Sequence, residues 1–424
     1  MQKQPTTSSS ASPAAAPGPT LSPTLSPAVL LLMATACGLC AGANYFNQPL
    51  LNSIAHALQV SESTAGILVT CAQVSYAIGL LFLVPLGDML ERRKLTVGLM
   101  LLAAIGLLVS GFAEWMPSPF TALVLGTLVT GLFSVAAQVL VPMAASLAPR
   151  ESSGRAVGLV MSGLLTGILL SRTVAGLLSA VGGWSLVYKA GGVAMVLVAL
   201  ALYRVLPKVA HSGARLPYGQ VLGSMATLIR TQPRLRTRTL LGGLAFASVS
   251  VLFSTMALML GGPEHGLSDS SIGLIGLSGV AGALMANAAG RLVDKGLERP
   301  TTAFSVLLLV VNWALLWYSQ HSVFLFIVGM LVIELALQGT HICNQNVIYR
   351  LAPEARSRIN ACYMTGYFIG ASAGSAIGAW AWHHGGWTGA CIAGTVLALL
   401  NVAALLADRR LSHPNAQASG PSAT

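Results

Sequence analysis

Twelve long apolar runs constrain the fold of this chain more than any other feature of its sequence. Only 8% of its 424 residues are charged, against about 25% in soluble domains, and the mean hydropathy is +0.74. A membrane-spanning helix needs about 20 apolar residues. Runs of that size lie at 28–51, 65–87, 95–113, 119–147, 156–180, 185–206, 239–260, 272–293, 302–320, 323–349, 359–381 and 388–408. A transmembrane barrel would show shorter segments of alternating polarity, so the sequence predicts an all-α membrane protein with twelve transmembrane helices.

The basic residues predict the orientation, because Lys and Arg accumulate in cytoplasmic loops. With the N-terminus inside, only Arg172 and Lys189 lie away from a cytoplasmic end, loop or tail. Near the opposite face lie all seven tryptophans: Trp115, Trp184, Trp313, Trp317, Trp380, Trp382 and Trp387. We therefore expect both termini in the cytoplasm of a multi-pass protein of the bacterial inner membrane. The net charge of +11 is spread over loops beside anionic lipid, so no nucleic-acid partner is expected.

The chain divides into two halves of six spans each. We expect a disordered cytoplasmic tail over residues 1–27, because they are rich in Ser, Thr, Pro and Ala. The N-terminal bundle then covers 28–206 and the C-terminal bundle 239–408, with a cytoplasmic tail at 409–424. Between the bundles, residues 207–238 predict a cytoplasmic linker that contains an interfacial helix.

Charged loops near the middle of each half repeat one pattern. The two copies consist of Gly87, Asp88, Arg92 and Arg93, and of Gly290, Asp294 and Arg299. Further repeats align Ala148 and Pro149 with Ala352 and Pro353, and the sequence Gly-Gly-Trp at 182–184 with that at 385–387. Halves that repeat in the same orientation indicate pseudo-symmetry about an axis along the membrane normal.

On these loops and repeats, residues 28–408 resemble a major facilitator superfamily transporter, and most closely the twelve-span drug:proton antiporter branch. The family loop has a Gly, an Asp four residues later, and a basic pair five and six residues after the Asp. The second copy fits this pattern, whereas the first has Val84 in place of the leading Gly. The resemblance implies a monomer that exports a small molecule in exchange for protons by alternating access, without a cofactor.

Two other signatures of that branch are incomplete. Thr130 stands where many proton-coupled relatives have Arg, so their coupling argument does not carry over. In the fifth span Gly163, Gly167 and Gly176 are present, but Ile168 replaces the Pro that normally follows the second Gly. Export is therefore implied by resemblance alone.

The paired loops are candidates for a conformational gate. Asp88 and Asp294 could pair with nearby basic residues or cap a neighbouring helix, and so hold one state until the halves rock. The alternative is a plain positive-inside loop with balanced charge. Two spaced copies that both contain Asp favour the gate.

Glu334 is the first candidate for a coupling residue. An ionisable group within a span is costly and usually faces a cavity or a partner. Glu334 lies near the middle of the tenth span, and helical spacing places Gln338, His341 and Gln345 on the same face. Glu334 could exchange a proton if burial favours its neutral form, with His341 passing the proton toward the cytoplasm. The alternative is a packed polar interface between helices.

Arg172 is the second candidate, because it keeps its charge within the fifth span. It could attract substrate or pair with Glu334, or it could extend to the outer interface.

Polar side chains at the end of the first span are candidates for substrate contact. The cluster includes Asn44, Tyr45 and Gln48, with Asn44 and Gln48 expected on one helical face. Gln73, Tyr76 and Gln138 join it with lower weight. Hydrogen bonds between helices would satisfy these groups equally well.

Other functions fit the sequence less well. Cys37 and Cys40 form a CxxC spacing, but a metal site of that type needs a second ligand pair. There is no HExxH, no GxSxG and no pair of catalytic carboxylates, which argues against an enzyme. An importer or facilitator of the same fold remains the alternative to an exporter, and a non-transporting sensor is less favoured.

Overall fold

Helices and the short segments that connect them make up the residues that the computed structural model describes, which are 26–148, 153–207, 217–279, 285, 288–289, 291–292, 295–351 and 356–411. The α-helices are α1 Pro27–Ala43, α2 Leu51–Leu58, α3 Glu62–Phe82, α4 Arg92–Gly111, α5 Pro119–Phe133, α6 Ala136–Leu147, α7 Ser153–Val205, α8 Tyr218–Thr231, α9 Pro233–Gly261, α10 Asp269–Ile275, α12 Glu298–Tyr318, α13 Val323–Leu351 and α14 Arg356–Leu411. Short 3-10 helices are η1 Gln48–Leu50, η2 Val84–Asp88, η3 Ala113–Trp115, η4 Gly276–Gly279 and η5 Ser319–His321.

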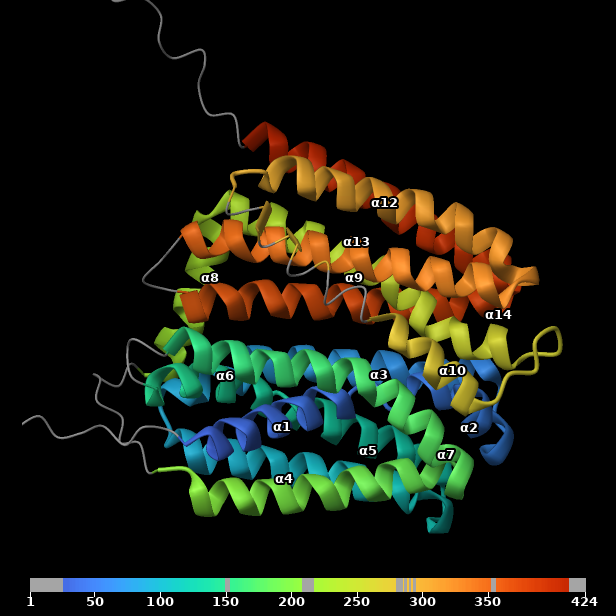
Figure 1. The fold of residues 1–424 in the computed structure, drawn as a ribbon, viewed down its shortest axis with the longest axis horizontal. Helices are drawn as coiled ribbons and strands as arrows, with labels where there is room; N and C mark the ends of the chain where they lie inside the picture. The colour runs from blue at the N-terminus through green and yellow to red at the C-terminus, as the bar shows by residue number, and fades with distance from the viewer. Residues whose placement is uncertain are drawn as a thin grey trace, which may run out of the picture.

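The helices run side by side in two groups, as Figure 1 shows. Helices α1 to α7 form one group, and α9, α12, α13 and α14 form the other, with α10 reaching across toward α7. Among the described residues, nine helical stretches are long and apolar enough to cross a membrane. Two of them bend into two spans each, so they account for eleven of the twelve predicted spans. The remaining one, 272–293, is described only in part.

Glycine pairs make the two bends. Gly182 and Gly183 interrupt α7, and Gly385 and Gly386 interrupt α14, at matching places in the two repeats. Gly183 has φ of 74° and Gly386 has φ of 53°, which is a backbone region that glycine enters without a steric cost. Each pair therefore turns one span directly into the next without a loop.

The first span does not continue as one helix, which corrects one prediction. Helix α1 ends at Ala43, and the chain turns before η1 begins at Gln48. Pro49 cannot donate a backbone hydrogen bond, and its ring would clash with the carbonyl group of Tyr45 in a continuous helix. Asn44 and Gln48 therefore do not share a helical face: Asn44 lines a small cavity, whereas Gln48 accepts a hydrogen bond from Arg172.

Helix α8 lies within the predicted linker, at the end of the bundle where α1 begins and α14 ends (Figure 1). We call this the linker end, and the opposite end, with α10, the far end. The Tyr218 hydroxyl donates to the carbonyl oxygen of Phe82 at 2.7 Å, and the Cys362 thiol contacts the carbonyl oxygen of Met225 at 3.7 Å. Helix α8 thus contacts α3 in one half and α14 in the other.

Candidate transport site

Arg172 lies inside the protein, between the two halves. Only 3% of this residue is exposed, so the side chain does not extend to the outer surface. Its Nε donates to Oε1 of Gln48 at 2.6 Å, and its guanidinium carbon lies 3.9 Å from the ring centre of Phe253 and 5.2 Å from that of Tyr45. One amide and two aromatic faces, one of them from α9 of the other half, therefore hold a permanent positive charge.

Glu334 is buried on α13, with 7% of the residue exposed. Within the described residues it makes no hydrogen bond and no ion pair, and in particular none with Arg172. The two charges still attract each other, and both influence Tyr45. The structure thus places a carboxyl group without a fixed partner in the field of a buried arginine.

A short glycine-containing turn, η4, lies beside both charges. A Cβ atom built on Gly276 would lie 3.4 Å from Cδ of Arg172, and one built on Gly279 would lie 3.8 Å from Oε1 of Glu334. Three residues of 3-10 helix advance by about 6 Å. The Arg172 side chain of one half and the Glu334 carboxyl group of the other therefore flank the same turn.

Aromatic side chains of α14 continue the site toward the linker end. Nδ1 of His341 lies 3.1 Å from the Tyr363 hydroxyl, and the His341 ring centre lies 4.8 Å from that of Tyr367. Tyr367 stacks on Phe246 of α9 at 4.3 Å. Gln338 and Gln345, on the same face of α13, are half-buried.

Tyr76, which is hydrogen-bonded to Gln138, contacts the opposite half. The Gln138 amide donates to the Tyr76 hydroxyl at 3.4 Å, and the Tyr76 ring lies 4.4 Å from that of Phe368. Gln73 is buried, and its Oε1 has no hydrogen-bond partner among the described residues. These three predicted residues therefore lie on the N-terminal half, with Tyr76 reaching α14.

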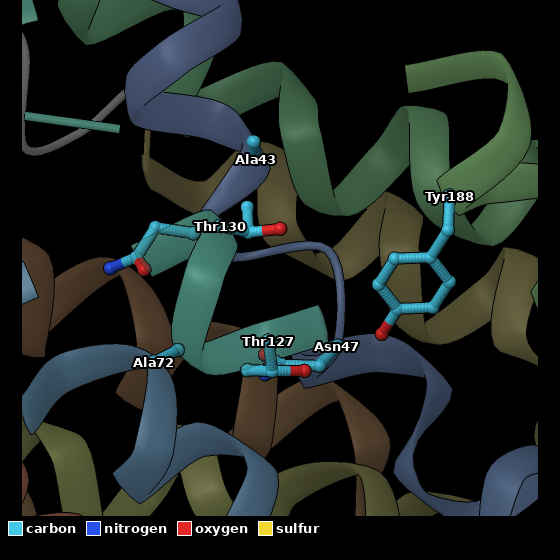
Figure 2. A pocket seen from close by; sticks show the side chains of 7 residues that line it. Ala43, Asn47, Ala72, Thr127, Thr130 and Tyr188 are labelled. Atoms are coloured by element: carbon cyan, nitrogen blue, oxygen red, sulfur yellow. The ribbon is translucent and has the colours of Figure 1, made fainter. Parts of the chain in front are cut away.

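A small polar cavity lies within the N-terminal half (Figure 2). It has a volume of about 10 Å³ and is lined by Ala43, Asn44, Asn47, Ala72, Thr127, Thr130 and Tyr188. Figure 2 shows Tyr188 reaching from α7 toward Asn47 and Thr127. Among the described residues, polar side-chain atoms of Asn44, Asn47, Thr127 and Tyr188 have no hydrogen-bond partner. Such a cavity has room for about one water molecule.

Packing explains why no arginine stands at position 130. The Thr130 hydroxyl donates to the carbonyl oxygen of Ala103 on α4 at 3.4 Å. A Cβ atom on Gly106 would lie 2.6 Å from the Thr130 nitrogen and 2.7 Å from the Gly126 carbonyl oxygen, so α4 and α5 approach closely. A guanidinium would fit neither this contact nor the small cavity beside it.

The first loop motif is anchored within its own half. Nε of Arg92 donates to the carbonyl oxygen of Gly87 at 3.1 Å, and its Nη1 donates to the Ser146 hydroxyl of α6 at 3.3 Å. A Cβ atom built on Gly87 would lie 3.5 Å from Cγ1 of Val139, which is an ordinary contact, so the packing does not require glycine there. The side chain of Asp88 lies outside the described residues.

Arg93 closes the end of α7. Its Nη1 donates to the carbonyl oxygens of Tyr203 at 3.4 Å and Leu206 at 3.3 Å, and its guanidinium lies 4.8 Å from the Tyr203 ring centre. This is favourable because the last carbonyls of a helix carry partial negative charge. In the second motif Gly290 and Asp294 lie outside the described residues, while Arg299 lines a cavity. The turn there contains Gly296 with φ of 78°, which sequence reasoning did not single out.

A polar seal at the far end was not predicted from the sequence. Oδ2 of Asp269 accepts hydrogen bonds from Ser53 at 2.6 Å and from Ser179 at 2.7 Å. Nε1 of Trp382 donates to Glu62 at 2.8 Å. All of these contacts join one half to the other. No local pattern marks Asp269 for this role, because its partners are at least 90 residues away in the chain.

The same fold occurs among solved membrane transporters. A bacterial homologue of the human lysosomal transporter Spinster, in an inward-facing and unoccupied conformation, superposes with a TM-score of 0.71 at 15% identity, covering 90% of this chain and 96% of its own. A family model described as Major Facilitator Superfamily matches residues 31–320 and residues 240–423. The chain belongs to the major facilitator superfamily. It is therefore a secondary transporter of a small solute and not an enzyme.

Relatives within the superfamily cover most of the chain. The putative uncharacterized transporter YgaY of Escherichia coli strain K12 is 52% identical over 375 residues, which is 88% of this chain and 94% of YgaY. A probable sugar efflux transporter of Helicobacter pylori is 23% identical over 339 residues, or 78% of this chain and 82% of the relative.

Proposed function

We propose that this transporter exports a small molecule in exchange for protons, with Glu334 carrying the proton. The observation that supports this most is the state of Glu334, whose buried carboxyl group has no hydrogen bond or ion pair within the described residues. A carboxyl group fixed in a packed interface would be bonded to its neighbours. One without a fixed partner can gain and lose a proton as its surroundings change.

The positions of the two charges suggest how protonation is coupled to movement. Arg172 belongs to the N-terminal half and Glu334 to the C-terminal half, so rocking of the halves changes the distance between them. An ionised Glu334 attracts Arg172, and a protonated one does so much less. Proton binding therefore changes the relative energies of the two conformations, which is the requirement for coupling.

The neighbouring groups supply contacts for a solute. We assign Arg172 and the aromatic rings around it to substrate orientation, together with Asn44, Tyr45, Gln48, Gln73, Tyr76, Gln138, Gln338 and Gln345. His341, held by the Tyr363 hydroxyl, would pass protons toward the linker end.

Export from the cytoplasm, rather than import, follows from the resemblance to the drug:proton antiporter branch and from the efflux relatives. We place the protein in the bacterial inner membrane as a monomer, with the linker end in the cytoplasm and the Asp88 and Asp294 loops as gates. In this orientation the far-end seal closes the outside. The alternative is an importer or facilitator, which the direction of flux would reveal.

The test uses purified protein in proteoliposomes. A thermal-shift screen against lipophilic cations, sugars, amino acids and organic anions first identifies a ligand, because a ligand that binds the folded state stabilises it. Transport of that ligand is then measured with and without a pH gradient. We expect the substitution Glu334→Gln to abolish the effect of the gradient while the protein still inserts and binds ligand.

Glu114→Gln is the matched control, since Glu114 is an exposed carboxylate at the far end. It should transport like the wild type. Full gradient-driven transport by Glu334→Gln would contradict the assignment, and uptake against the expected direction would favour the importer.

A further inference from the structure

A second cavity lies at the linker end of the C-terminal half, away from the transport site. It has a volume of about 350 Å³ and is formed by the first turns of α9 and α12 and the last turn of α14. Its lining residues are Arg238, Arg299, Pro300, Thr302, Leu405, Asp408 and Arg409. Three arginines and one aspartate therefore surround a space large enough for a phosphate group.

The aspartate is already neutralised by residues of α9. Oδ2 of Asp408 lies 2.7 Å from Nη2 of Arg238 and 4.0 Å from Nη2 of Arg234, and the Thr237 hydroxyl donates to its Oδ1 at 2.7 Å. Arg238 is only 2% exposed, and its Nε has no hydrogen-bond partner among the described residues. Arg299 and Arg409 line the same cavity, so three of its four charged lining residues are basic.

Apolar side chains continue from the cavity along the outside of the bundle. On α12, Pro300 shares a helical face with Phe304, Leu307 and Val311, which are 58%, 60% and 57% exposed. On α14, Arg409 shares a face with Leu406 and Leu399, which are 52% and 53% exposed. Two stripes of side chains suited to hydrocarbon thus lead from the basic cavity toward the membrane interior.

We propose that this cavity binds the phosphate group of an anionic phospholipid, with its acyl chains along the two stripes. Arginine binds phosphate oxygens through charge-assisted and often paired hydrogen bonds, and basic pockets between spans are suited to anionic head groups. The apolar stripes favour a lipid over a soluble phosphate compound. Because Arg299 also belongs to the second loop motif, the lipid would contact the loop that we assign to gating.

The test measures the unfolding temperature and native mass spectra of the delipidated full-length protein in detergent. The added probes are phosphatidylglycerol, phosphatidylcholine with the same acyl chains, and inorganic phosphate alone. We expect phosphatidylglycerol to raise the unfolding temperature and to remain bound in the mass spectrum. Phosphatidylcholine and inorganic phosphate should do neither. Stabilisation by phosphatidylcholine to the same extent, or by inorganic phosphate alone, would overturn the proposal.

Two neighbouring arginines provide a matched pair of variants. Arg409 lines the cavity, whereas Arg410 is exposed and does not line it. Arg409→Gln should weaken phosphatidylglycerol binding about fivefold, as expected for one basic group near an anionic lipid. Arg410→Gln should leave the binding unchanged. An equal loss in both variants would mean that general surface charge attracts the lipid, and the site would be rejected.

Discussion

One repeat offset pairs Thr130 in the N-terminal half of the transporter with Glu334 in the C-terminal half. The offset of 204 residues that aligns Pro149 with Pro353 also aligns these two positions. In the N-terminal half the threonine is packed against α4 beside a cavity of about 10 Å³. In the C-terminal half the carboxyl group lies near Gly279 without a fixed partner among the described residues. In the N-terminal half this position therefore contributes to helix packing, whereas in the C-terminal half it carries an ionisable group.

The two halves also differ at their linker ends, where one arginine is packed and the other lies beside a cavity. The offset of 206 that aligns the loop motifs pairs Arg93 with Arg299. Arg93 is buried and fills its corner by binding the last carbonyl groups of α7. Arg299 is exposed and borders a cavity of about 350 Å³. Arg93 therefore packs tightly against its own half, whereas Arg299 lies beside a cavity.

The most severe test of the first comparison is to give the N-terminal half a carboxyl group by Thr130→Glu. The side chain would enter a close contact between α4 and α5 without a partner. We expect a loss of about 3–5 kcal/mol of folding free energy, the cost of an uncompensated buried charge. Unfolding temperature in detergent measures it, with Thr130→Ser as a control that keeps the hydroxyl group. A Thr130→Glu variant as stable as the wild type would mean that position 130 accommodates a carboxyl group as position 334 does.

A double-mutant cycle tests whether the charges of the two halves act together. Arg172→Gln and Glu334→Gln, singly and combined, are compared by the affinity of the ligand found in the screen. We expect a coupling energy of about 2 kcal/mol, as for residues within one interaction network. Strictly additive effects would show that the attraction across the halves is unimportant for binding.

The far-end seal can be weakened without changing Thr130, Glu334 or the two arginines at the linker end. Asp269→Ala removes the acceptor for Ser53 and Ser179. The conformation with a closed far end should therefore become about 1.4 kcal/mol less stable relative to the open one, which lowers its relative population about tenfold. Spin labels at Ala57 and Glu264, both exposed at this end, would report longer distances. Glu114→Gln should leave the distances unchanged, and an unaltered distribution in Asp269→Ala would remove the seal from the mechanism.

The smallest effect is expected for Arg93 and Arg299 at the linker end, in the absence of lipid. Arg93→Gln should lower stability by about 1 kcal/mol, because the carbonyl groups at the end of α7 lose their partner. Arg299→Gln should change it by less than about 0.5 kcal/mol, as is usual for an exposed side chain. Thermal unfolding of the two variants measures the difference. Equal losses of stability would contradict the contrast between a packed Arg93 and an exposed Arg299.

The sequence was sufficient to predict the class of fold because its signals are local. Apolar length identifies spans, and the repeated Gly-Gly-Trp segments lie where the structure bends α7 and α14. The break before Gln48 was not predicted, because Pro49 does not by itself decide how the helix ends. A single proline allows either a kink or a complete stop, and packing decides between them.

The residues around Arg172 show why the site was harder to predict. Its hydrogen-bond partner Gln48 is 124 residues away, and Phe253 comes from the other half. Both candidates for charge were recognisable because ionisable residues within spans are rare. Their partners depend on how α7, η4 and α13 pack, which no spacing in the sequence encodes. The basic cavity likewise forms only when the ends of three separate helices meet.

The glycine bends have a practical consequence for anyone who wishes to attach a tag or an antibody epitope to this protein. At Gly183 and Gly386 one span leads directly into the next, so an inserted sequence would force two membrane helices apart. The connection between α9 and α10 is different, because Pro263 and Glu264 are exposed in a turn outside both helices. An insertion between these two residues should leave both bundles intact, and it would mark the far end for imaging or purification.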